Sequence, residues 1–290
     1  MIPGLKIGTK EEKVKRFYLN RRQKTLLTIV VATIILLSVV VGGAMLDQER
    51  IATNLNERNL PPSLKHLFGT DWLGRDMFTR TIMGLSLSMG VGLIGAIGST
   101  SIALVLGMVS ATMGKMADRL ITWLIDLFLS VPHLVTLILI AFTLGGGFKG
   151  IVIGLMLTHW PSLARVIRAE VMQIRSAEYV QISQQMGKSS WWIAVHHIFP
   201  HLIPQLLIGF MLMFPHVILH EAAVTFLGLG LSPHEPAIGI ILSESMKYLS
   251  SGMWWLAFFP GLCLLIIVRT FETIGENFRM LIDPTRANEK

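Results

Sequence analysis

Apolar residues in this chain gather in long blocks that short polar stretches separate. A block of about 20 apolar residues spans the hydrocarbon core of a bilayer when it folds as a helix. Six blocks approach that length, and each predicts a membrane-spanning helix: residues 25–46, 86–113, 120–144, 151–166, 202–229 and 254–273. The pattern therefore predicts an all-α, polytopic membrane bundle with six transmembrane helices.

The polar stretches divide the chain into five segments. We expect a basic N-terminal segment, a first transmembrane helix, a long loop, a transmembrane domain and a polar tail: residues 1–24, 25–46, 47–85, 86–275 and 276–290. The loops inside the transmembrane domain are too short to hold a soluble catalytic domain. The longest of them lies between the fourth and fifth apolar blocks, at residues 167–200.

Composition agrees with this pattern, and charge adds an orientation. Hydrophobic residues make up 52% of the chain and charged residues 15%, against about a quarter charged in soluble domains. Eight of the 25 Lys and Arg residues precede residue 25: Lys6, Lys10, Lys13, Lys15, Arg16, Arg21, Arg22 and Lys24. The 47–85 loop carries as many acids as bases. Because Lys and Arg accumulate on the cytoplasmic side of membrane helices, both termini are predicted to be cytoplasmic and this loop extracytoplasmic. We expect the protein to contact membrane lipid and not to bind nucleic acid.

Small residues recur every four positions along the second apolar block, at Gly95, Ser99, Ala103 and Gly107. Residues at this spacing share one face of a helix. Small side chains on such a face let two helix backbones approach closely, which drives helix packing in lipid. We therefore expect this face to be a packing surface and not a ligand site.

The sequence lacks the usual motifs of an enzyme. Gly187-Lys188-Ser189 resembles the end of a phosphate-binding loop, but Ile182 stands where that motif needs a glycine. His220-Glu221 begins like a metalloprotease motif but lacks its second histidine. The lone cysteine, Cys263, excludes a disulfide within the chain. We expect no catalytic residues and no cofactor bound by this chain.

The loop between the fourth and fifth blocks carries the most specific pattern. Residues 179–200 contain a short amphipathic stretch, a break at Gly187 and a second helix expected to end at Pro200. This arrangement resembles the cytoplasmic coupling loop of bacterial ATP-binding-cassette importers, whose pattern is Glu-Ala-Ala, three residues, Gly, nine residues and Ile-x-Leu-Pro. The Gly and Pro match, whereas residues 181–183 replace Glu-Ala-Ala. The resemblance implies an ATPase-docking role for five residues: Tyr179, Gln181, Ser183, Met186 and Gly187.

Further stretches are similar to the C-type permeases for peptides, opines and nickel. They are Phe68-Gly-Thr-Asp-Trp-Leu-Gly-Arg-Asp76, His220-Glu-Ala-Ala-Val-Thr-Phe-Leu-Gly-Leu-Gly230, Phe259-Pro-Gly-Leu262 and Asp283-Pro284. The resemblance implies the type I importer permease fold in a bacterial inner or plasma membrane. It also implies a homologous second permease, two ATPase subunits that bind ATP and Mg²⁺ and hydrolyse the ATP, and an extracytoplasmic substrate-binding protein.

Histidines suggest a cargo. His133, His159, His216 and His220 lie in or near the apolar blocks, and the last two are one helical turn apart. Neutral imidazole suits nickel, cobalt, copper and zinc, and the stretches around His159 and His216 look more like those of nickel-type permeases. We therefore expect import of nickel, cobalt, zinc or a metal chelate (metallophore), with His159, His216, His220 and Glu221 along the pathway. The same three histidines are candidate metal ligands.

Two other interpretations remain open at this point. A di- or oligopeptide importer would share the same family motifs. An ion-coupled secondary transporter would need carboxylates near the middle of the bilayer, and the candidates for that role are Asp126 and Glu221.

Overall fold

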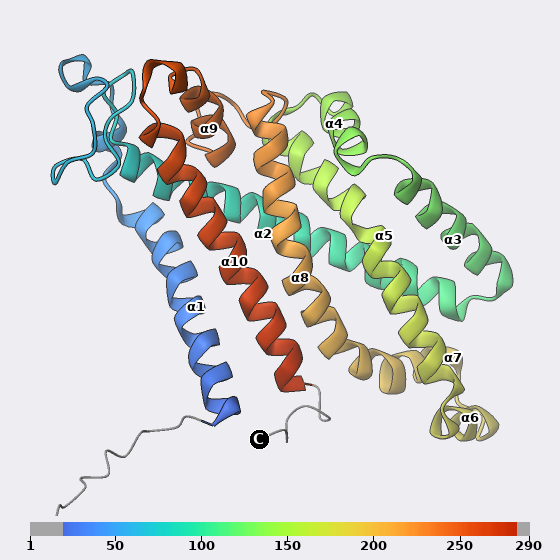
Figure 1. Ribbon diagram of the computed structural model, residues 1–290. Helices are drawn as coiled ribbons and strands as arrows, with labels where there is room; N and C mark the ends of the chain where they lie inside the picture. The colour runs from blue at the N-terminus through green and yellow to red at the C-terminus, as the bar shows by residue number, and fades with distance from the viewer. Residues whose placement is uncertain (1–19, 283–290) are drawn as a thin grey trace, which may run out of the picture.

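The computed structural model describes residues 20–282, and these residues form helices and loops without a β-strand. Most of the basic N-terminal segment and the Asp283-Pro284 motif lie outside the described residues. Long helices form the bundle (Figure 1): α1 (Arg21–Met45), α2 (Met77–Thr112), α5 (Gly147–Ser176), α8 (Phe199–Phe226) and α10 (Trp255–Ile282).

Within residues 20–282, five helical segments are long and apolar enough to cross a membrane, and a bent pair raises the number to six if it counts as one span. This pair, α3 (Lys115–Ser130) and α4 (His133–Thr143), occupies the predicted 120–144 span but turns by 98° between its halves. Pro132 explains the break, because a residue before proline avoids the helical region and Val131 is extended. The predicted 120–144 span therefore consists of two helices that meet at an angle.

The second long helix begins earlier than the apolar pattern predicts. Asp76 caps α2, accepting hydrogen bonds from the Thr79 backbone N–H at 2.9 Å and from its hydroxyl at 2.8 Å. The expected start near Ser86 missed about two turns, because these turns contain polar residues that are buried: Thr79, Arg80 and Thr81. That loop contains two short 3₁₀ turns, η1 (Gln48–Ile51) and η2 (Leu55–Glu57).

The helix predicted to end at Pro200 continues through this residue into α8, so the predicted end is wrong. After α6 (Glu178–Gln185), α7 (Ser190–Ile193) passes through the π-helical turn η3 (Ala194–Ile198) into α8. Pro200 lies in the first turn of α8, where a missing backbone N–H is tolerated. Residues 190–226 therefore form one continuous helical segment.

The core is organised around the close packing of α2 against α5, and the small-residue face predicted from the sequence provides it. Ser99 and Ala103 are fully buried. A Cβ atom on Gly107 would lie 2.8 Å from the side chain of Ile167 and 2.9 Å from the Ala164 carbonyl oxygen. The two helices thus approach to a distance that only glycine permits at this point.

Ion pairs join the 46–76 loop to α2 and to a helix near residue 244. Arg80, which is 4% exposed, donates to Asp71 at 2.6 Å and to Glu244 at 2.9 Å, and Arg75 contacts the same two carboxylates. Glu244 belongs to α9 (Ile238–Met246), which η4 (Leu249–Ser251) follows. This balanced group of two cations and two anions holds the loop onto α2 and α9.

The ends of the bundle differ in what they carry. In Figure 1, the start of α1 and the end of α10 lie at the same end as α6 and α7, whereas the 46–76 loop and α9 lie at the opposite end. The start of α1 and the end of α10 thus lie at the same end of the bundle as the 179–200 loop (Figure 1), while the termini themselves lie outside the described residues. Which side faces the cytoplasm stays a prediction.

Adding one methyl group to α2 tests the close approach. We expect Gly107→Ala to lower the free energy of unfolding by about 1–3 kcal/mol, as overpacking does. Gly90→Ala in the same helix is the matched control, because nothing lies within 4 Å of its added Cβ. Thermal unfolding of the two purified variants in detergent measures the difference. Equal midpoints would show that α2 and α5 do not depend on this contact.

Removing one member of the buried charge group should be costly. Arg80→Met leaves Asp71 buried with less compensation, and breaking such a pair costs about 3–5 kcal/mol. Arg269→Met removes a largely exposed pair with Glu272 and should cost about 0–1 kcal/mol. Membrane levels and unfolding midpoints of the two variants provide the comparison, and the same loss in both would contradict the assignment.

Candidate functional site

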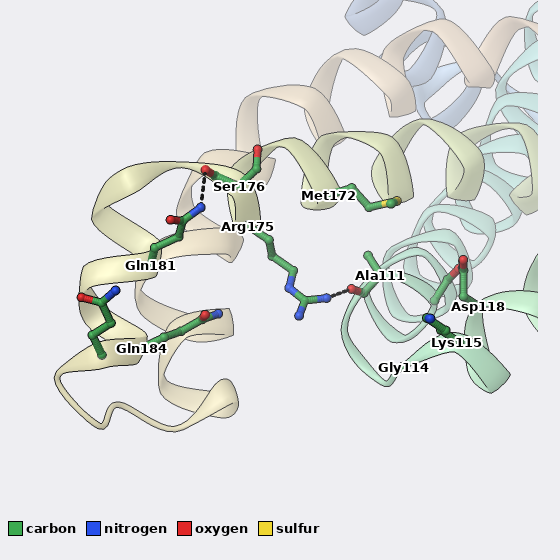
Figure 2. Close-up of a pocket in the computed structure, with 11 residues that line it drawn as sticks. Ala111, Gly114, Lys115, Asp118, Met172, Arg175, Ser176, Gln181 and Gln184 are labelled. Carbon is green, nitrogen blue, oxygen red and sulfur yellow. Dashed lines mark hydrogen bonds between the residues drawn. The ribbon is translucent and has the colours of Figure 1, made fainter.

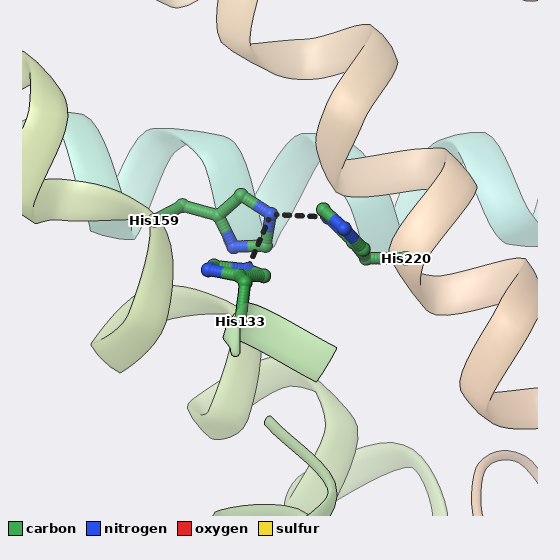
Figure 3. Close-up of side chains that lie close together, drawn as sticks. All are labelled: His133, His159 and His220. Atoms are coloured by element: carbon green, nitrogen blue, oxygen red, sulfur yellow. Dashed lines mark hydrogen bonds between the residues drawn. The ribbon is translucent and has the colours of Figure 1, made fainter. Parts of the chain in front are cut away.

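Three histidines from three helices meet inside the bundle (Figure 3). His133 is the first residue of α4, where the break after Pro132 turns the chain. His159 belongs to α5 and His220 to α8. The Nε2 atom of His159 lies 3.2 Å from Nε2 of His133 and 3.1 Å from Nδ1 of His220. One ring nitrogen therefore faces both neighbours.

Hydrogen bonds to the other side of the His159 ring determine its tautomer. Its Nδ1 atom lies 3.1 Å from the Leu155 carbonyl oxygen, which can only accept. The Thr158 hydroxyl donates to the Gly154 carbonyl oxygen at 2.9 Å and lies 3.2 Å from the same Nδ1 atom. Nδ1 of a neutral His159 must carry the proton, so Nε2 presents a lone pair to His133 and His220.

The structure changes the set of candidate ligands. His216 is exposed and does not join the cluster, although it lies one turn from His220 on α8. Among the described residues, the group that could hold a metal ion is His133, His159 and His220, with ligand atoms within 4.8 Å of one another. The position of His133 directly after Pro132 was the sequence signal that could have identified it.

A cavity of about 400 Å³ opens beside the cluster and is lined by α3, α4, α5 and α8. Its wall includes all four histidines together with apolar residues such as Leu129 and Met213. No Asp, Glu, Lys or Arg is among the described residues that line it. The cavity combines imidazole donors with an apolar, uncharged wall.

The carboxylates proposed from the sequence lie elsewhere. Glu221 is completely buried and accepts a hydrogen bond from the Thr225 hydroxyl at 2.8 Å, and it is not part of the cavity wall. Asp126 pairs with Arg165 at 2.6 Å, and both side chains are more than half exposed. The structure therefore does not bring Glu221 together with the histidines.

The second candidate region, α6 with its surroundings, lies at the end of the bundle. Val180 is fully buried and anchors the helix. The Gln181 side chain donates to the Ser176 carbonyl oxygen at 3.0 Å, which links α6 to the end of α5. Ser183 lies 3.0 Å from His197, which links α6 to the start of the α8 segment. The Tyr179 ring stacks near His201 in α8.

A cleft of about 820 Å³ separates α6 from the turn between α2 and α3 (Figure 2). Arg175 crosses it to donate to the Ala111 carbonyl oxygen. Gln181 and Gln184 line the α6 side, and Lys115 lines the opposite wall. Of the five residues predicted for ATPase docking, Gln181 lines this polar cleft.

Beyond the cleft, α6 and α7 present apolar side chains to the outside. Ile182 is 55% exposed, Met186 74% and Trp191 78%. Gly187 ends α6 with φ +79°, a left-handed conformation that a Cβ disfavours, and its surroundings are open. Exposed apolar patches mark contact surfaces for another protein or for a membrane.

Comparison with known proteins identifies the fold. Residues 103–284 match the family described as the binding-protein-dependent transport system inner membrane component. An inward-facing structure of the methionine ABC transporter MetNI is similar with a TM-score of 0.58, covering 71% of this chain and 98% of that chain. Its sequence identity of 17% supports a shared fold alone.

Permeases of peptide transport systems are similar in sequence over most of this chain. The dipeptide transport system permease of Bacillus subtilis is 31% identical over 245 residues, covering 84% of this chain and 77% of that protein. The oligopeptide transport system permease of the same organism is 31% identical over 274 residues, covering 94% and 89%. This chain is therefore a multi-pass inner-membrane protein and belongs to the binding-protein-dependent transport family, within the peptide-type permeases of ATP-binding-cassette importers.

Proposed function

We propose that this chain forms one half of the membrane pathway of an ATP-driven peptide importer. The observation that carries the proposal is the similarity to dipeptide and oligopeptide permeases along 84% and 94% of the chain. These relatives favour the peptide alternative over the expected import of nickel, cobalt, zinc or metal chelates. The other half of the pathway is a homologous permease, and an extracytoplasmic binding protein delivers the cargo.

The α6–α7 surface is the proposed docking site for a partner ATPase. Ile182, Met186 and Trp191 supply exposed apolar contacts, and ATP with Mg²⁺ binds to the ATPase subunits. The fixed links from α6 to α5 and to the α8 segment transmit a displacement of α6 to both helices. These are the helices that carry His159 and His220. Closure of the ATPases would thus move the walls of the histidine-lined cavity.

Metal or metal-chelate import remains a second candidate because of one observation. Three neutral imidazoles converge beside a cavity in the membrane region, and nickel, cobalt, copper and zinc accept such ligands. An ion-coupled secondary transporter lacks comparable support, since Asp126 is an exposed, paired residue and Glu221 lies off the cavity.

Uptake in a strain that lacks this chain tests the cargo class. We expect uptake of radiolabelled dipeptide to fall to background and to return when the gene is supplied on a plasmid. Unchanged dipeptide uptake in the deleted strain would contradict peptide import. Parallel measurements with radiolabelled nickel and cobalt test the second candidate.

A substitution at Gly187 tests the coupling assignment. Gly187→Val forces a β-branched residue into a left-handed turn, which strains the end of α6 by about 1–2 kcal/mol. We expect ATP hydrolysis by the assembled importer to persist while uptake falls about tenfold or more.

Two control variants distinguish the effect of substituting position 187 from the effect of backbone strain in general. Gly187→Asn should retain uptake, because asparagine tolerates this conformation. Gly114→Val forces a β-branched residue onto another glycine with positive φ, in the α2–α3 turn, where Gly114 has φ +90° and open surroundings, and should retain coupling. Normal uptake in the Gly187→Val variant would show that α6 is not the coupling element.

A further inference from the structure

We propose that His133, His159 and His220 bind one divalent transition-metal ion, and that this ion enters the pathway as part of the cargo, chelated by a short peptide. The metal site stands on the geometry alone. The statement about the cargo rests on the proposed function, because it names the chemical form in which a peptide would pass this cavity.

The spacing of the three nitrogens suits a metal ion. Ligand nitrogens about 2.0–2.1 Å from a tetrahedral ion lie roughly 3.3 Å from one another. The two separations at His159 Nε2 are 3.2 Å and 3.1 Å. The ligand atoms of all three residues lie within 4.8 Å of one another, so binding an ion requires the third pair to close from at most that distance.

The hydrogen bonds around His159 orient it as a ligand. The Leu155 carbonyl oxygen holds the proton on Nδ1 and leaves Nε2 as a lone pair. This is the usual outer arrangement of a metal-bound histidine, whose other nitrogen donates to a carbonyl or carboxylate. Without a metal, two neighbouring rings compete for one lone pair, whereas an ion would accept electron pairs from all three rings.

The site is open on one side, as a site for a passing ligand must be. Three protein ligands leave the remaining coordination positions of a transition-metal ion free for donors from outside, and a cavity of about 400 Å³ lies beside the three histidines. This volume falls within the range of small-molecule sites, about 300–1,000 Å³. A closed cage of protein ligands, which would retain the ion, is not formed by the described residues.

The charge of the site selects a chelate over a bare ion. All three ligands are neutral imidazoles, and no acidic residue is among the described residues that line the cavity. A divalent ion would therefore bring two uncompensated positive charges into an apolar environment, which is costly. The terminal carboxylate of a peptide chelator, and its amide nitrogen once chelation has released the amide proton to solvent, supply the missing negative charge at the open positions.

The ligands also lie on helices that the coupling surface can move. His159 and His220 stand on α5 and α8, and α6 contacts both of these segments. Displacement of α6 would change the separation of the two rings and lower the affinity of the site. Release of the chelate then follows from the same motion that opens the pathway.

Binding of Ni²⁺ tests the site directly. The importer would be isolated with its partner subunits through a tag without histidine, reconstituted in nanodiscs and dialysed against radioactive Ni²⁺. We expect His159→Asn to weaken binding by at least about tenfold, since even the loss of an outer-shell partner costs about 10–100-fold. Asparagine can retain the donor to Leu155 while removing the Nε2 lone pair.

Further variants show whether a loss of Ni²⁺ binding comes from the missing ligand or from misfolding. His133→Ala and His220→Ala should each weaken Ni²⁺ binding to a similar degree. His216→Ala is the matched control, because it removes a histidine from the same cavity but not from the cluster, and should change affinity by less than about twofold. Retained ATP hydrolysis identifies variants that are assembled. If His159→Asn binds Ni²⁺ as wild type does, or if His216→Ala weakens binding equally, the proposed site is wrong.

Uptake measurements separate the free ion from the chelate. Cells would be given radioactive Ni²⁺ alone, Ni²⁺ with glycylglycine, or radiolabelled glycylglycine with EDTA. We expect glycylglycine to raise Ni²⁺ uptake about tenfold, and His159→Asn to abolish the increase. Equal Ni²⁺ uptake with and without the dipeptide would overturn chelate transport. Persistent dipeptide uptake in the deleted strain would instead contradict peptide import itself, while the binding experiment would still decide the site.

Discussion

The close approach of α2 and α5 is the constraint on which the other parts of the structure depend. Inside a bilayer, lipid tails are as apolar as leucine side chains, so helices associate through close packing and not through exclusion of water. The buried face of Gly95, Ser99, Ala103 and Gly107 permits that packing. It holds α5 against α2, and α5 also packs against α4 and α8. The position of His159 and the attachment of α6 both follow from it.

The histidine cluster and the α6–α7 surface are both attached to α5 and α8. The histidine cluster lies between α4, α5 and α8, and the α6–α7 surface is fixed to the end of α5 and to the start of the α8 segment. A permease performs no covalent chemistry, so its work consists of changing which side of the membrane can reach its cargo. If the proposed cargo contacts and the proposed docking surface are correct, they share helices, and one displacement would affect both.

Much of this arrangement could be predicted from the sequence, because apolar length and small-residue spacing are local properties. The bend at residues 131–132 was harder to predict from the sequence. Pro132 predicts an interruption of the helix, but the 98° angle also depends on the packing of α4 on α5. Pro200 misled the prediction, since the π-helical turn before it lets the helix continue. The pairing of His133 with His159 and His220 depends on three distant segments, and helix periodicity alone therefore favoured His216.

The docking of the ATPase on α6 is the central claim, and site-specific cross-linking tests it most directly. In a Cys263→Ser background the chain has no other cysteine, so Met186→Cys introduces a single reactive position on the exposed end of α6. Met45→Cys does the same at the opposite end of the bundle, where Met45 is 80% exposed. The account predicts a cross-link from position 186 to an ATPase subunit and none from position 45. An assembled importer that cross-links through position 45, or fails to do so through position 186, would contradict it.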